Sequence, residues 1–142
     1  MTTATEKTRH ILPLLDTQLR LTAELESLLQ AEYQALLGSD LATLAALVAS
    51  KRSTAESLER ASLDLGQHTG GMPQMVIPQL GPEALQRWQQ LGLAADGLRK
   101  QNLHNGALLN ERQNRLRWVA ERANRETPAL YAPRINTRDR KS

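Results

Sequence analysis

The chain lacks residues on which several large classes of protein depend. It has no cysteine and no phenylalanine, and aromatic residues make up only 3% of its length. Without cysteine it can form no disulfide, no zinc–thiolate site and no catalytic thiol. So few aromatic residues also disfavour an aromatic-lined pocket for a small molecule. We therefore expect a protein that is not an enzyme and that has no cofactor.

Residues that favour β-strands are almost as scarce. There are three valines and three isoleucines, against 26 leucines and 18 alanines in 142 residues. Leucine and alanine are strong helix formers, whereas β-branched and aromatic residues fit a pleated sheet. The composition predicts an all-α fold in which helices pack on helices, and the length suits a single domain.

The first ten residues lack the charged and then apolar layout of a secretory signal. No stretch approaches the roughly 18 consecutive apolar residues of a membrane span. We expect a cytoplasmic protein that does not cross the membrane.

Charge is distributed unevenly along the chain. Residues 1–123 hold 13 basic and 13 acidic residues, so the net charge of +3 lies in residues 124–142. We expect this basic tail to be flexible, as chain ends commonly are. Nucleic-acid binding is a weak alternative, because Glu111 and Glu121 dilute the arginines of residues 112–125.

Leucine periodicity predicts a first helix over residues 11–37, with Pro13 in its first turn. We expect Gly38 to end this helix in a left-handed conformation and Asp40 to cap the next helix, over residues 41–65. Because the turn is so short, the two helices should form an antiparallel hairpin.

The second helix has a heptad seam with weak positions at Lys51, Ala55 and Ser62. Either another helix covers this gap or the seam stays partly open. Glycines and prolines predict a flexible link over residues 66–81, with at most a short helical turn near residues 75–80.

Pro82 opens a long helix that we expect to run to residue 123, giving one helical-bundle domain over residues 1–123. The hairpin should pack on this helix in an elongated, coiled-coil-like bundle. Asn102 and Asn105 take seam positions there. They either set the helix register, or mark the point beyond which the apolar face belongs to a partner.

No spacing of residues indicates catalysis or a metal. His10, His68 and His104 are far apart in sequence and match no metal-binding motif. A protein partner is better supported, since Leu109, Leu116 and Val119 recur at helical spacing. The residues expected to bind it are Leu109, Leu116, Trp118, Val119, Leu130 and Tyr131.

The order of these features resembles the FlgN-type flagellar export chaperones. This resemblance rests on Lys51 in the second helix, Asn102-x-x-Asn105-Gly106, Arg115-Leu116 and Leu130-Tyr131-x-Pro133. The resemblance implies a cytoplasmic chaperone that covers the helical ends of hook-associated subunits and delivers them to the flagellar type III export apparatus. It also implies that the C-terminal part of the chain contacts cargo and that the loaded chaperone docks at the export gate. The alternatives are a coiled-coil adaptor that only oligomerises and, less favoured, a nucleic-acid binder.

Overall fold

The computed structural model describes residues 3–126. The elements in chain order are α1 (Ala4–Gly38), α2 (Leu41–His68), α3 (Pro73–Val76), the 3-10 helix η1 (Ile77–Leu80) and α4 (Pro82–Glu126). No strand occurs among these residues, so the predicted all-α class is confirmed. Within the same residues, no helix has a stretch apolar enough, over a sufficient length, to cross a membrane.

The chain divides into two compact units, Met1–Asn105 and Gly106–Ser142. The first unit contains α1, α2, α3, η1 and α4 as far as Asn105. The second contains the rest of α4, which the structure describes to Glu126. The expected domain over 1–123 and tail over 124–142 stay predictions.

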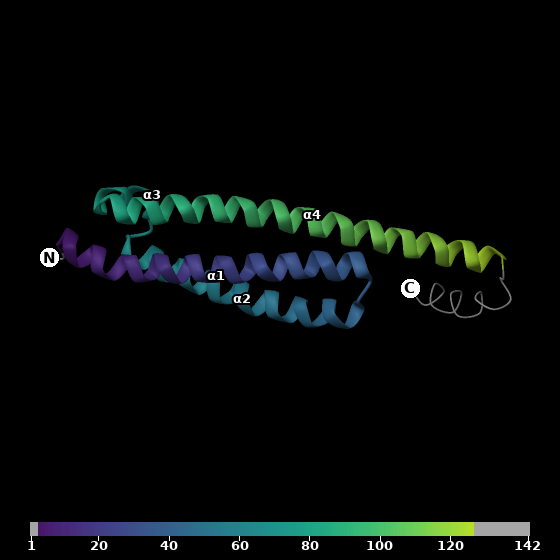
Figure 1. Cartoon of the computed structure of the whole chain (residues 1–142). Helices are drawn as coiled ribbons and strands as arrows, with labels where there is room; N and C mark the ends of the chain where they lie inside the picture. The colour runs from purple at the N-terminus through teal and green to yellow at the C-terminus, as the bar shows by residue number, and fades with distance from the viewer. Residues whose placement is uncertain (1–2, 127–142) are drawn as a thin grey trace, which may run out of the picture. The chain divides into compact units, whose positions relative to one another are not determined.

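In the first unit α1 and α2 lie side by side and run in opposite directions, as predicted (Figure 1). Their direction follows from two contacts, since residue 18 of α1 bonds to residue 61 of α2 and residue 32 bonds to residue 51. The left-handed residue of the turn is Ser39, with a φ of 58°, and the expectation for Gly38 is wrong. The Ser39 N–H bonds to the Ala35 carbonyl and closes the end of α1.

Asp40 caps α2 as predicted. Its carboxylate accepts hydrogen bonds from the Thr43 backbone N–H at 3.1 Å and from the Thr43 hydroxyl at 2.6 Å. The hydroxyl bond and, after it, the backbone bond lower the pKa of Asp40 below its ordinary value of 3.8.

Helix α1 begins well before the expected start at residue 11. Thr3 and Glu6 form a capping box in which each side chain accepts a bond from the other residue's backbone N–H. The box satisfies N–H groups of the first turn and so extends the helix toward the N-terminus. Pro13 consequently lies inside the helix, and its expected place in the first turn is wrong.

Short helices occupy much of the segment expected to be a flexible link. The glycines at 70 and 71 turn the chain with positive φ, and α3 and η1 follow directly. The helical turn expected near residues 75–80 therefore falls where these two elements lie. Ile77 is completely buried, so this segment contributes to the core instead of only joining α2 to α4.

The core of the first unit lies where the start of α1, the end of α2 and the start of α4 meet. Its buried members are Ile11, Leu15, Leu65, Ile77, Ala84 and Leu91. Ala84 and Leu91 bring α4 onto the hairpin, and an ion pair of 3.1 Å joins Arg87 of α4 to Asp16 of α1. This packing holds the N-terminal part of α4 against both hairpin helices.

Candidate functional site

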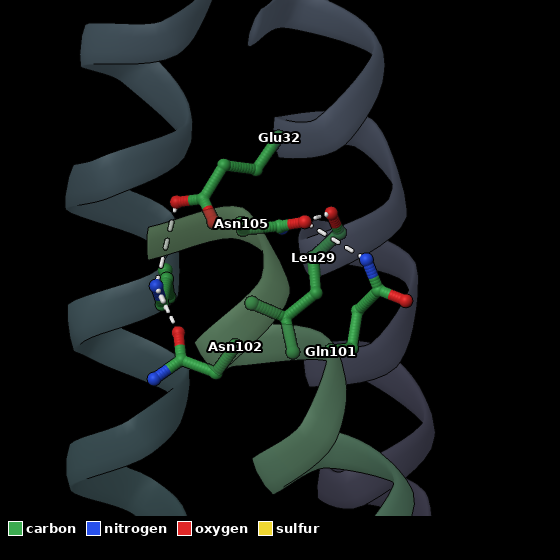
Figure 2. Close-up of polar contacts among 6 residues, drawn as sticks. Leu29, Glu32, Gln101, Asn102 and Asn105 are labelled. Carbon is green, nitrogen blue, oxygen red and sulfur yellow. Dashed lines mark hydrogen bonds and ion pairs between the residues drawn. The ribbon is translucent and has the colours of Figure 1, made fainter. Parts of the chain in front are cut away.

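A buried polar cluster joins the three long helices of the first unit (Figure 2). Its centre is Asn105, whose side chain is 1% exposed. The Asn105 amide nitrogen donates to the Leu29 carbonyl at 2.8 Å and to a Glu32 carboxylate oxygen at 2.9 Å. The Asn105 oxygen accepts from the Gln101 amide at 2.8 Å. Asn105 is thus fully bonded in a position where an unpaired amide would be costly.

Lys51 extends the cluster to α2. Its ammonium group donates to the Asn102 oxygen at 2.7 Å and to the second Glu32 oxygen at 3.4 Å. Lys51, one of the weak seam positions of α2, therefore faces Asn102, one of the two seam asparagines of α4. These directional bonds are satisfied in one alignment of the helices, which favours the interpretation that the asparagines set register.

Glu32 completes this cluster, although it is not among the residues predicted from the sequence. The signal was present, because Glu32 follows Leu29 by three residues and precedes Leu36 by four on the apolar stripe of α1. A carboxylate in such a stripe needs a hydrogen-bonding or charged partner. Lys51 and Asn105 supply it.

The weak seam of α2 also leaves a cavity of about 500 Å³ among α1, α2 and α4. Its lining includes Leu58, Ser62, Leu65, Trp88, Gly92 and Leu98. Ser62 and Gly92 are too small to fill the space between the larger side chains. Of the two outcomes expected for the seam, the structure therefore shows a partly open one near Ser62.

The second unit has a different surface. Among its described side chains, from residue 106 to residue 125, none is buried. Leu109, Leu116 and Val119 are 38%, 69% and 52% exposed. At 3.6 residues per turn these three lie on one side of the helix. They form an exposed apolar stripe, here named the C-terminal stripe.

Trp118 is 52% exposed but does not lie on the C-terminal stripe. It follows Leu109 by nine residues, which places it about 180° away around the helix. The Arg122 guanidinium lies 5.2 Å from the centre of its ring, a cation–π arrangement. Sequence spacing thus groups three of the four helical candidate residues, with Trp118 on the opposite side.

The remaining two candidates, Leu130 and Tyr131, lie outside the described residues. Their part in binding a partner stays a prediction.

The family model described as "FlgN protein" matches residues 7–131, which is most of the chain. No curated protein and no solved structure matches the chain.

Proposed function

The chain belongs to the FlgN protein family, and we propose from this membership that it is a cytoplasmic chaperone for flagellar protein export. Its cargo is the class of hook-associated subunits. It covers their helical, aggregation-prone ends and delivers them to the type III export apparatus, where the loaded chaperone docks at the export gate.

The C-terminal stripe is the observation that carries the proposed cargo site. Large apolar side chains exposed next to one another commonly mark a surface that a partner covers. A helix that presents such a stripe can pair with an amphipathic helix of the partner. Leu109, Leu116 and Val119 supply the apolar contacts, and Trp118 adds a second, aromatic contact on the opposite side.

The physical mechanism is coupled folding and binding. A cargo end that is disordered before assembly becomes helical against the stripe, and the entropy lost in ordering it reduces the net affinity. Moderate affinity suits a chaperone that must release its cargo at the export apparatus. Because cargo binds the folded chaperone, saturating cargo should raise the melting temperature.

The proposal is tested by replacing both Leu116 and Val119 with alanine and titrating a hook-associated subunit's terminal segment calorimetrically. Each anchor buried in the complex contributes roughly 1–3 kcal/mol, so the double variant should bind at least tenfold more weakly. The matched control replaces Leu63 and Leu93, which are 62% and 75% exposed in the first unit. That control should bind with wild-type affinity.

Failure can take two forms with different meanings. If the wild-type chain binds no hook-associated segment, the proposed chaperone function is wrong. If it binds and the stripe variant keeps wild-type affinity and helicity, the cargo site lies elsewhere. A chain that ends after Glu126 keeps the whole of α4 and tests the tail, since it should bind more weakly if Leu130 and Tyr131 contact cargo.

A coiled-coil adaptor could use the same stripe to join copies of the chain. Sedimentation at increasing concentration separates the two functions. An adaptor forms oligomers that Leu116→Ala and Val119→Ala disrupt, whereas a chaperone loses cargo affinity without any change in oligomeric state.

A further inference from the structure

Two histidines far apart in sequence lie together in the first unit. His10 lies in the first part of α1 and His68 is the last residue of α2. Their ring centres are 6.1 Å apart, with 35° between the ring planes. Both rings are exposed and line one surface cavity of about 300 Å³. The two imidazoles are therefore accessible to the same small ligand.

The protonation of one ring follows from its backbone contact. The His68 Nδ1 lies 2.9 Å from the Asp64 carbonyl oxygen. A carbonyl can only accept, so in this hydrogen bond Nδ1 carries the hydrogen and neutral His68 has its lone pair on Nε2. A ring nitrogen bonded to a backbone carbonyl is also the usual outer partner of a metal-binding histidine, because it orients the ring.

We propose that His10 and His68 together bind one divalent transition-metal ion, of the zinc or nickel class. An ion about 2.1 Å from one nitrogen of each ring, with a tetrahedral angle between the two bonds, holds the ring centres about 5.3 Å apart. The two exposed rings, whose centres are 6.1 Å apart, need to approach each other by less than about 1 Å to bind it. Imidazole suits such ions, whereas magnesium and calcium prefer oxygen ligands. Among residues 3–126 no set of three potential ligand side chains could hold a metal, so water completes the coordination.

The surroundings of the site set its strength and its effect. Glu6 and Lys7 line the same cavity. The Glu6 carboxylate attracts a cation, and the Lys7 ammonium group repels it. Two protein ligands and a nearby ammonium group give an exchangeable site of moderate affinity. A bound ion links the start of α1 to the end of α2, beside the core residue Ile11. It should therefore raise the melting temperature by mass action.

The test is titration of the full chain, without a histidine tag, with nickel chloride and zinc chloride. We expect one equivalent to bind and the melting temperature to rise, with no effect of magnesium chloride. His10→Ala and His68→Ala should each weaken binding at least tenfold and abolish the thermal shift. His104→Ala is the matched control, since the ring of this third histidine lies beside that of Tyr33 instead, with the centres 5.5 Å apart, and the variant should bind like the wild type.

Lys7→Gln gives an independent arm, because removing the repelling ammonium group should strengthen binding. Circular dichroism checks that each variant keeps its helicity. The proposal is overturned if the wild-type chain binds neither ion. It is also overturned if His104→Ala weakens binding as much as His10→Ala, or if the histidine variants fold normally and bind like the wild type.

Discussion

The two stretches of α4 differ in what they bury. Between Pro82 and Asn105 the helix has an alanine, a leucine and an asparagine that are almost fully buried. From residue 106 onward no described side chain is buried, although leucines, a tryptophan and a valine are present. An asparagine is thus 1% exposed on the same helix that leaves Leu116 69% exposed.

Apolar character alone does not decide which side chains of this helix are buried. Asn105 is buried because Leu29, Glu32 and Gln101 satisfy its amide. Leu116 remains exposed although its side chain is apolar. The first stretch thus contributes to the packing of the first unit, and the second exposes the apolar surface that we propose for cargo binding.

The largest loss of unfolding free energy should come from a substitution in the core of the first unit. Leu15 is completely buried, so Leu15→Ala should lower the free energy of unfolding by about 2–5 kcal/mol through lost contacts and a new cavity. Leu116→Ala removes the same atoms from an exposed position and should change the free energy of unfolding by less than about 0.5 kcal/mol. Urea denaturation followed by circular dichroism measures both. Equal losses from the two substitutions would remove the distinction between the stretches.

A smaller loss of unfolding free energy is expected from a substitution in the polar cluster around Asn105. Asn105→Ala leaves the Leu29 carbonyl and the Glu32 carboxylate without their buried donor, and should cost about 1–3 kcal/mol of unfolding free energy. Asn110→Ala is the matched control, because Asn110 is exposed in the second unit. Thermal unfolding of both variants is the measurement. If the two asparagines prove equally dispensable, the cluster does not stabilise the first unit.

Much of the fold could be predicted from the sequence, because it depends on local signals. The excess of leucine predicts the helical class, and the turn before Asp40 predicts both the hairpin and the cap. The start of α1 was missed because the prediction followed the apolar stripe. The capping box of Thr3 and Glu6 lies ahead of that stripe and depends on side-chain bonds to the backbone.

The sites were less predictable, because they combine residues from separate helices. Lys51 and Asn102 could be recognised as irregular seam positions, but the bond between them depends on how α2 and α4 align. His10 and His68 show no metal-binding spacing, and only the antiparallel hairpin brings them together. The C-terminal stripe was predictable, since helical periodicity alone places its three residues on one side.

The smallest predicted effect concerns acid sensitivity at the Asp40 cap, which belongs to the first unit. The Thr43 hydroxyl bond and, after it, the backbone bond hold the pKa of Asp40 below its ordinary value of 3.8. The ionised carboxylate therefore favours the folded state. This contribution is fully present above the unfolded pKa and is lost as the pH falls through the lower folded pKa. Asp40→Asn keeps a good cap without the titrating group, so its melting temperature should fall less than that of the wild type as the pH is lowered below about 4. Melting temperatures of both proteins across this range test the prediction, and parallel curves would show that the Asp40 cap does not contribute to acid sensitivity.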